Sequence, residues 1–382
     1  MIYLDQGATS FPKLPAVKQA VMDALDNNMN AQRSTGAFKT DRLLYSTRKL
    51  VAQYFNLPSF DHVIFNSGNT ESLNTCLKGI LSKDDHVITT YAEHNSVLRP
   101  LRQIGVDLTV TAPYKEDILK EIREDTKMIV MTHSSNVTGE LYDIDTIGQI
   151  AYENHILFVV DSAQSAGHIS IDMQKSHIDL LTFSGHKALL GMSGVGGICV
   201  NTDILIHPLK TGGTGIDSFN KKQPDSYPEH LEAGTLNIPG IASLNAGMTY
   251  LLEHQKEIEE KEKQLFDALY EGMKRINGIT FYCDYDACLH TPIIAFNLED
   301  YDSSKISDVL SYKYDIITRC GAHCAPLMHT HLNTVERGIV RFSLSFMNSM
   351  EEVNTVIDVL KEMTEELSLI HISEPTRRSY IS

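Results

Sequence analysis

The chain has 382 residues, which is enough for two or three domains of ordinary size. Its 49 acidic and 33 basic residues give a formal charge of −16, which argues against a general binder of nucleic acid or of anionic membranes. Six cysteines are too few for a disulfide-rich scaffold, and no apolar stretch approaches the ~20 residues that span a bilayer. The first residues also lack the basic and apolar regions of a secretory signal. We therefore expect an enzyme-sized protein in the reducing cytoplasm.

Short apolar runs alternate with amphipathic stretches over the first 200 residues. Strands rich in Val, Ile, Leu and Phe are typical of a buried parallel sheet, and helices between them indicate a doubly wound α/β domain. We expect strands at His62–Asn66, His86–Thr90, Met128–Thr132, Ile156–Val160, Leu180–Ser184 and Gly197–Val200. We expect helices at Ala16–Asp26, Glu71–Leu81, Lys115–Glu124 and Asp145–Asn154.

The pattern changes after about residue 240 and predicts a smaller α+β domain. Its expected elements are one long or broken helix at Ser243–Ile276, strands at Ile279–Cys283, Pro292–Asn297 and Ile339–Ser345, and helices at Ser303–Tyr312 and Met350–Glu366. We expect a large domain at residues 13–250 and a small domain formed by residues 1–12 and 251–368. Residues 369–382 resemble a translated vector junction, with a native disordered tail as the alternative.

The most informative stretch contains Asp161 and Lys187, each placed just after an apolar run. Ligands of open α/β sheets bind at such carboxyl ends of strands. A lysine there suits a Schiff base with pyridoxal 5′-phosphate (PLP), and Asp161 suits the protonated ring nitrogen of that cofactor. Ser184 and His186 flank the lysine and are expected to donate to the cofactor phosphate. The alternative is an ordinary strand-end aspartate with an exposed lysine.

Nine sequence pieces extend this pattern along residues 1–366. They are YLDQGATSFP at 3–12, NSGNTESLN at 66–74, EHNSV at 93–97, HSSNVTGE at 133–140, VDSAQSAGH at 160–168, FSGHK at 183–187, LEAGTLNIPG at 231–240, RCGAHCAP at 319–326 and VRFSLSFMN at 340–348. In content and order they resemble the class V branch of the fold-type I PLP enzymes. Within that branch, the resemblance is to cysteine desulfurases and selenocysteine lyases.

The resemblance implies roles in holding the cofactor. Asn69 and Thr70 match the turn that cradles the phosphate at a helix N-terminus, although the family often has threonine where this chain has Asn69. His94 matches the histidine that stacks on the cofactor ring and assists proton transfer. Asn136 and Gln164 match groups that bond the 3′ oxygen of the cofactor.

Thr235 matches a residue that reaches the phosphate of the neighbouring subunit's cofactor. The resemblance therefore implies a homodimer with a shared active site.

The resemblance also implies how the substrate is bound and cleaved. Arg341 matches the arginine that binds the substrate carboxylate, and an ion pair inside the small domain is its alternative role. Arg319 and Asn136 are further expected substrate contacts. Lys187 would act as the base at the α-carbon. Cys324 would attack the substrate sulfur as a thiolate, giving a persulfide and alanine, with positive charge from His323 and the arginines lowering its pKa.

The remaining cysteines and histidines leave alternatives open. We interpret Cys76, Cys199, Cys283 and Cys288 as core residues and assign no role to Cys320. A zinc site formed by Cys320, His323, Cys324, His329 and His331 is an alternative, but the spacing does not match a common zinc pattern, and we predict no metal.

Three functional hypotheses follow from the sequence. The first is a cysteine desulfurase, with selenocysteine as a further substrate, that passes sulfur from a short loop to an acceptor protein. The second is an aminotransferase or carbon–sulfur lyase of the same class that does not use Cys324. The third is a non-enzymatic protein that has kept the fold, because fold alone does not fix function.

Overall fold

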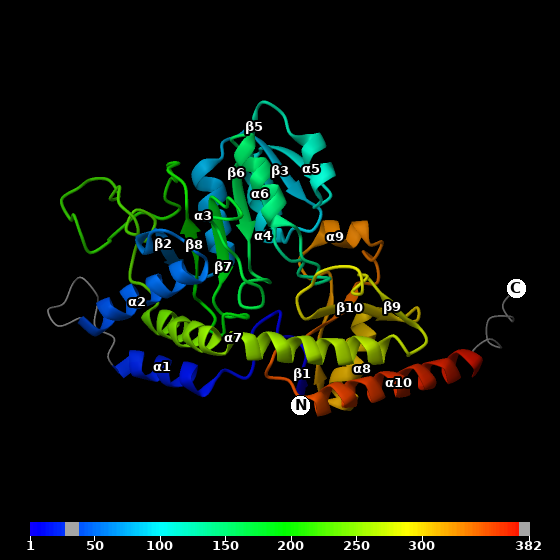
Figure 1. Ribbon diagram of the computed structural model, residues 1–382. Helices are drawn as coiled ribbons and strands as arrows, with labels where there is room; N and C mark the ends of the chain where they lie inside the picture. The colour runs from blue at the N-terminus through cyan, green and yellow to red at the C-terminus, as the bar shows by residue number, and fades with distance from the viewer. Residues whose placement is uncertain (27–37, 374–382) are drawn as a thin grey trace, which may run out of the picture.

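The structure is a computed structural model that describes residues 1–26 and 38–373 (Figure 1). Within this part of the chain, the larger sheet has seven strands in the order β2-β8-β7-β6-β5-β3-β4. β8 is antiparallel to both of its neighbours, and the pairs from β7 to β4 are parallel. The strands are β2 (Val63–Asn66), β3 (His86–Thr90), β4 (Asp107–Thr111), β5 (Thr126–Thr132), β6 (Leu157–Asp161), β7 (Leu180–Ser184) and β8 (Gly196–Val200). The predicted, mainly parallel sheet is thus confirmed.

Strand β4 is the element of this sheet that the sequence did not predict. It lies at the edge, and its residues are half-buried or exposed, whereas all five residues of β3 are buried. An edge strand has one neighbour and little core contact, so its sequence lacks a strong apolar run.

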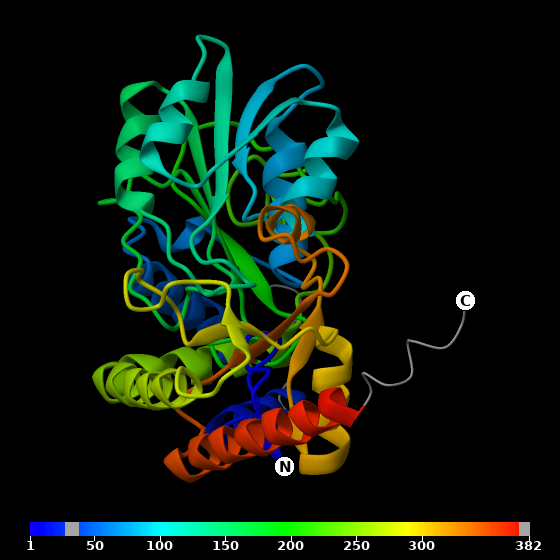
Figure 2. The same ribbon diagram turned by 90° about the vertical axis from the view of Figure 1, so that its right-hand side faces the viewer.

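Helices cover both faces of the large sheet, as a doubly wound fold requires (Figures 1 and 2). Alternate residues of β6 point to opposite faces of the sheet. Phe158 and Val160 join the core beneath α2 and α6, whereas Val159 joins the core beneath α3 and α4. The helices of this domain are α1 (Pro15–Asp26), α2 (Phe38–Tyr54), α3 (Asn69–Ile80), α4 (Asn95–Ile104), α5 (Lys115–Glu121) and α6 (Ile144–Glu153), with a 3-10 turn η1 (Phe60–His62).

The second core belongs to an antiparallel sheet, which has four strands in the described chain, in the order β12-β13-β10-β9. The N-terminal strand β1 pairs with β11 beside it, so the first residues of the chain lie against the C-terminal part. The elements are β1 (Ile2–Tyr3), β9 (Ile279–Phe281), β10 (Ile293–Leu298), α8 (Ser303–Tyr314), β11 (Ile316–Ile317), β12 (Arg319–Gly321), α9 (Pro326–His331), β13 (Ile339–Ser343) and α10 (Met350–Ser373).

Helix α7 (Ile238–Met273) joins the two parts of the molecule and runs along one side of both (Figure 1). It packs on α1 and α2 in its first half and on α10 in its second, and it departs from helical geometry at His254. The expectation of one long or broken helix is confirmed, although the helix begins five residues before Ser243. The domain boundary expected at residue 250 falls inside it.

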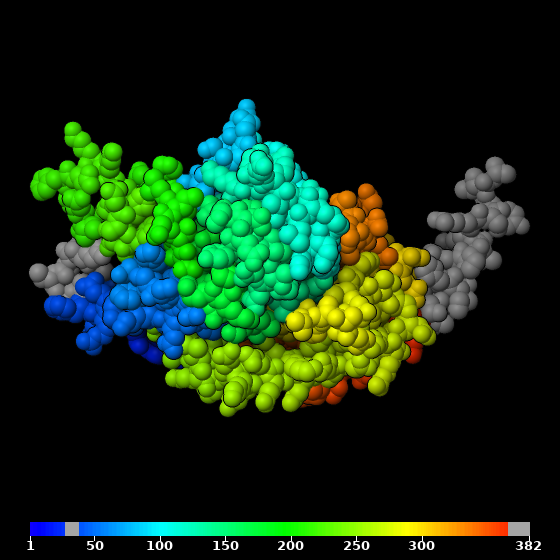
Figure 3. Space-filling model, turned by 45° about the horizontal axis from the view of Figure 1, so that its top comes forward, coloured from blue at the N-terminus to red at the C-terminus, as the bar shows by residue number. Residues whose placement is uncertain are grey.

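Helix α10 continues past Glu366 to Ser373, so the first five residues of the expected tail are helical. The rest of that tail, residues 374–382, lies outside the described residues. Across residues 1–26 and 38–373, no helix is both long and apolar enough to cross a bilayer. The space-filling view shows the two parts lying against each other, with the segment near residue 290 against the large-domain loops (Figure 3).

Candidate active site

Asp161 and Lys187 lie at neighbouring strand ends, as the sequence predicted. Asp161 is the last residue of β6 and is buried, and its Oδ1 accepts hydrogen bonds from Asn69 Nδ2 (2.8 Å) and Ala163 N (2.9 Å). Lys187 follows the end of β7 by three residues and is partly exposed. Burial lowers the pKa of Lys187 to about 8, while the nearby Asp161 carboxylate opposes this shift. At this pKa roughly a tenth of the Lys187 side chains are neutral at pH 7, far more than for an ordinary lysine.

The N-terminus of α3 forms a second wall. Gly68 precedes the helix with a φ of 144°, and a Cβ there would meet no atom within 4 Å. The helix starts at Asn69, two residues earlier than predicted, so Asn69 and Thr70 lie in its first turn. Thr70 Oγ1 lies 2.8 Å from Ser96 Oγ. Such a helix start presents free N–H groups and a positive dipole toward open space.

His94 caps the N-terminus of α4. Its Nδ1 accepts a hydrogen bond from Ser96 N (3.0 Å), so the neutral ring carries its proton on Nε2. Burial is the main cause that lowers the pKa of His94, with the Lys187 and Arg319 charges adding to it and Asp161 opposing it. The ring is therefore neutral near pH 7.

Arg341 and Arg319 lie opposite each other on β13 and β12. Arg341 is 2% exposed, pairs with Asp5 Oδ1 through Nη2 (2.7 Å) and donates from Nη1 to the carbonyl of Asn136 (2.8 Å). Its Nε is buried without a hydrogen-bond partner among the described residues. Arg319 is exposed. The ion pair foreseen as an alternative for Arg341 thus exists, and it binds the arginine to the N-terminal segment.

Cys324 lies between β12 and α9 and is exposed. Both Cys324 (φ 58°) and His323 (φ 48°) adopt left-handed backbone conformations. The carbonyl of Cys324 accepts from Asn95 N (2.7 Å), and that of His323 accepts from Asn136 Nδ2 (2.6 Å). Two consecutive carbonyls therefore fasten the loop to the large domain.

The histidines near Cys324 differ from expectation. Burial, reinforced by the Arg341 charge, holds the pKa of His323 well below its ordinary value, so the predicted positive charge on His323 is wrong. Its ring stacks with that of His329 at 5.8 Å, and His331 stacks on Tyr91 at 4.0 Å. In the part of the chain that the structure describes, no three His, Cys, Asp or Glu side chains group as metal ligands, which leaves the zinc alternative without support.

The remaining predicted residues vary in their surroundings. Gln164 is buried and donates to the carbonyl of Gly7 (3.0 Å), and Ser184 is buried at the end of β7. His186 Nδ1 is buried and has no hydrogen-bond partner within residues 1–26 and 38–373, and burial together with the Lys187 charge lowers the pKa of His186 to about 4. Thr235 is exposed in the loop before α7, and no hydrogen bond in the described chain joins it to the residues above.

The cysteines fall into three groups. Cys76 and Cys199 are fully buried, as predicted. Cys283 and Cys288 are only partly buried but pack against the second core, and their sulfurs lie 2.9 Å apart. Cys320 is half-buried on β12.

Two residues around the site were missed in the sequence. Asp5, the partner of Arg341, lies in the first quoted sequence piece. Glu93, next to His94, is fully buried and accepts from Thr90 Oγ1 (2.7 Å) and Thr132 N (3.0 Å). Burial raises the pKa of Glu93 to about 8. A carboxylate directly preceding the matched histidine was the available signal.

Both the sequence and the fold of this chain are similar to those of known proteins. Residues 2–356 match the family described as aminotransferase class-V. A probable cysteine desulfurase of Pyrococcus abyssi is 31% identical, over 96% of this chain and 95% of that protein. The cysteine desulfurase IscS of Dictyoglomus turgidum is 30% identical, over 97% and 96%. The apo structure of a cysteine desulfurase from Thermococcus onnurineus has a TM-score of 0.88 at 30% identity, covering 96% and 95% of the two chains. The chain belongs to the class-V aminotransferase family and has the fold of its cysteine desulfurases.

Proposed function

We propose that this class-V enzyme is a PLP-dependent cysteine desulfurase that converts L-cysteine to L-alanine and holds the released sulfur as a persulfide on Cys324. The observation that carries the proposal is the exposed Cys324, fastened through its own carbonyl to Asn95, the residue that follows His94. This contact holds the loop that carries the Cys324 thiol against the N-terminus of α4, which His94 caps. The printed names of the relatives favour the same activity.

The residues present fit the cofactor. Asn69 Oδ1, Asn136 Oδ1 and His186 Nδ1 are buried without a partner among the described residues, as expected of groups that bond a polar molecule. Asn69, Thr70, Ser184 and His186 would hold the phosphate, Asp161 the ring nitrogen, Asn136 and Gln164 the 3′ oxygen, and His94 the ring face. When bound, PLP supplies an electron sink for charge that develops at the substrate α-carbon.

Lys187 is the proposed base. Because its pKa is about 8, a substantial neutral fraction can accept the α-proton on Nζ near physiological pH. The Asp161 carboxylate, oriented by Asn69, balances the positive charge that the lysine then carries.

Arg341 and Arg319 are the proposed carboxylate-binding pair. They face each other across two antiparallel strands, and the unpartnered Nε of Arg341 is free to donate. With the carboxylate held there, Cys324 Sγ attacks the substrate sulfur as a thiolate. The new S–S bond forms as the C–S bond of the substrate breaks, and the electron pair of that bond stays with carbon. A proton added at Cβ and the proton returned by Lys187 to the α-carbon then complete alanine.

The proposal extends to partners and location. We propose a homodimer in which the exposed Thr235 reaches the phosphate held by the second copy. The short loop of Cys324 favours delivery of sulfur to an acceptor protein that comes to the loop. A cytoplasmic location suits a thiol that must be free between turnovers.

The decisive test replaces Cys324 by alanine and measures alanine and sulfide formed from cysteine. We expect product formation to fall at least ~10²-fold, because the nucleophile is lost. Visible absorbance from bound cofactor should persist in Cys324→Ala and disappear in Lys187→Ala. The matched control is Cys320→Ala, which should retain activity.

Two results of this experiment would favour a different function for the protein. Unchanged turnover of cysteine by Cys324→Ala would overturn persulfide chemistry and favour a lyase or aminotransferase. Activity kept only on selenocysteine would favour a selenocysteine lyase, because a selenol leaves without help from that thiol.

A further inference from the structure

Two cysteines outside the proposed active site lie close together. Cys283 follows β9 and Cys288 precedes β10, and their sulfurs are 2.9 Å apart. The carbonyl of Asp284 accepts from both Ala287 N and Cys288 N (3.0 Å each), closing a tight turn between the two cysteines. The chain thus returns on itself and brings the second sulfur back to the first.

This turn is fixed to the rest of the molecule. The buried Tyr285 at its centre donates its hydroxyl proton to the carbonyl of Thr138 (2.9 Å) and accepts from Ala295 N (2.7 Å). Lys274 pairs with Asp286 on the outside (2.8 Å). Because the turn is held on both sides, the two sulfurs stay near each other without further ordering of the chain.

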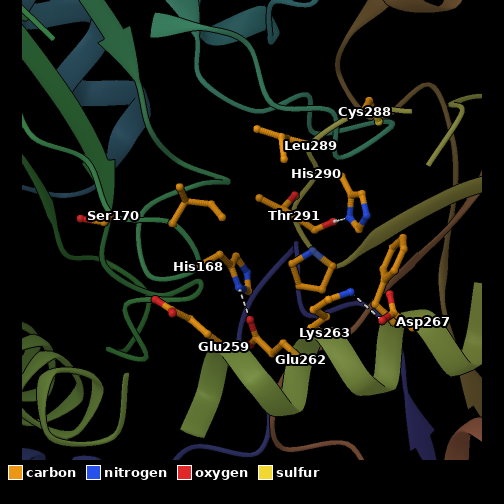
Figure 4. A pocket seen from close by; sticks show the side chains of 13 residues that line it. His168, Ser170, Glu259, Glu262, Lys263, Asp267, Cys288, Leu289, His290 and Thr291 are labelled. Carbon is orange, nitrogen blue, oxygen red and sulfur yellow. Dashed lines mark hydrogen bonds and ion pairs between the residues drawn. The ribbon is translucent and has the colours of Figure 1, made fainter. Parts of the chain in front are cut away.

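The pair is also accessible. Both cysteines are partly exposed, whereas Cys76 and Cys199 are fully buried. Cys288 lines a cavity of about 450 Å³ between α7 and the segments around residues 168 and 290. Figure 4 shows this cavity with Cys288 at one side and the His168–Glu262 and Lys263–Asp267 pairs at the other. Among the charged side chains of this lining, the acidic Glu259, Glu262 and Asp267 outnumber Lys263.

We propose that Cys283 and Cys288 form a redox-active dithiol, which a low-molecular-weight disulfide oxidises reversibly to an intramolecular disulfide. The Cys288 thiolate attacks one sulfur of the small disulfide and expels one thiolate. Cys283, after losing its proton, then attacks the Cys288 sulfur of the mixed disulfide and expels the second. Two electrons pass from the protein to the small disulfide, which leaves as two thiols.

The order of attack follows from the contact between the sulfurs. The contact between the two sulfurs lowers the pKa of Cys288 and raises that of Cys283. The thiolate therefore forms first on Cys288, the cysteine that lines the cavity. A disulfide has an S–S length of about 2.05 Å, so closing the bond needs only a small movement. This inference does not depend on the reaction at Cys324.

The test incubates the full-length protein with glutathione disulfide, blocks free thiols with iodoacetamide and analyses tryptic peptides by mass spectrometry. The sequence is well suited to this test, because trypsin releases the two cysteines together in peptide 276–305. Cys320 and Cys324 fall together in peptide 320–337, and Cys76 and Cys199 in separate peptides. We expect peptide 276–305 to lose two hydrogens, to resist alkylation and to recover both thiols after dithiothreitol.

Single variants identify the steps. In Cys283→Ser, a glutathione adduct should accumulate on Cys288, because the resolving thiol is missing. In Cys288→Ser, modification of Cys283 should be at least ~10-fold slower than that of Cys288 in Cys283→Ser. Alkylation of both cysteines in the treated wild type, or modification no faster than that of buried Cys76, would overturn the proposal.

Discussion

The large-domain side of the site and the small-domain side are held in place by different means. Asp161 and Lys187 follow strands whose neighbours bond them along their length, and Asn69 ties the aspartate to a helix start. Cys324, in contrast, lies in a short loop with two left-handed residues, fastened to the large domain by two carbonyl hydrogen bonds and a ring stack.

The two sides of the site are therefore sensitive to different kinds of substitution. The large-domain groups are placed by the sheet itself, so a change there alters chemistry more than position. The loop groups depend on contacts across the domain boundary, so a change there alters position first. The predictions below test this distinction.

The largest effect is expected from Lys187→Ala. Removal of the proposed base should lower alanine formation from cysteine by at least ~10³-fold, because a positioned base contributes that much. The unfolding temperature should stay near that of the wild type, since the lysine is partly exposed and lies after the strand. Comparable activity in the variant would contradict the assignment of Lys187.

Glu93→Gln should stabilise the protein at alkaline pH. The pKa of Glu93 is about 8 in the folded protein and 4.5 in the unfolded chain. The contribution of Glu93 to the free energy of unfolding is therefore fully present below pH 4.5 and is lost as the pH rises to about 8. Glutamine stays neutral, and we expect a gain of roughly 1–3 kcal/mol at pH 9 that vanishes near pH 4. Unfolding temperatures at both pH values measure it, with the exposed Glu336→Gln as control. An equal effect at both pH values would refute a titrating Glu93.

Tyr91→Ala tests the loop side. Losing the stack on His331 should cost ~0.5–1.5 kcal/mol of cross-domain contact and lower kcat roughly threefold to tenfold. Hydrogen exchange of residues 322–331 should rise at the same time. Tyr91→Phe loses the hydroxyl that bonds Tyr114 but keeps the ring, so it should keep the stack on His331 and a kcat close to that of the wild type. If kcat falls without faster exchange in this segment, the contact does not act by positioning the loop.

The smallest effect is expected from Arg319→Gln. The Arg319 charge is one of the smaller causes that lower the pKa of Lys187, so its removal should move the pH midpoint of Lys187 slightly upward. In the cofactor-free protein, the rate at which an amine reagent modifies Lys187 follows its neutral fraction. Arg123→Gln, which changes an arginine paired with Asp107, is the control and should leave the midpoint in place.

The sequence predicted six of the seven strands of the large sheet, all except β4, because their apolar runs are continuous and bounded by turns. It also predicted that Asp161 and Lys187 meet at one edge, since parallel strands end together. It could not predict that Asp5 would pair with Arg341, because the two residues are 336 positions apart. The local sequence around either residue does not indicate the other as its partner.

The cysteines also show that contacts between residues distant in the sequence are hard to predict from it. The apolar segment around Cys199 predicts that this residue lies in a strand and is buried. The closeness of Cys283 and Cys288 depends on a turn whose hydrogen bonds reach Thr138 and Ala295, and these contacts carry no local signal. The sequence therefore does not predict which partly buried loop residues lie close together in the fold.

Helix α7 bears on how the chain can be divided experimentally. Its first half packs on α1 and α2, its second half packs on α10, and β1 at the start of the chain pairs with β11. A fragment cut at residue 250 would expose the apolar side of both halves and lose the N-terminal strand. The two parts are therefore poor candidates for separate expression, and inserted tags or labels belong in exposed loops such as residues 215–222.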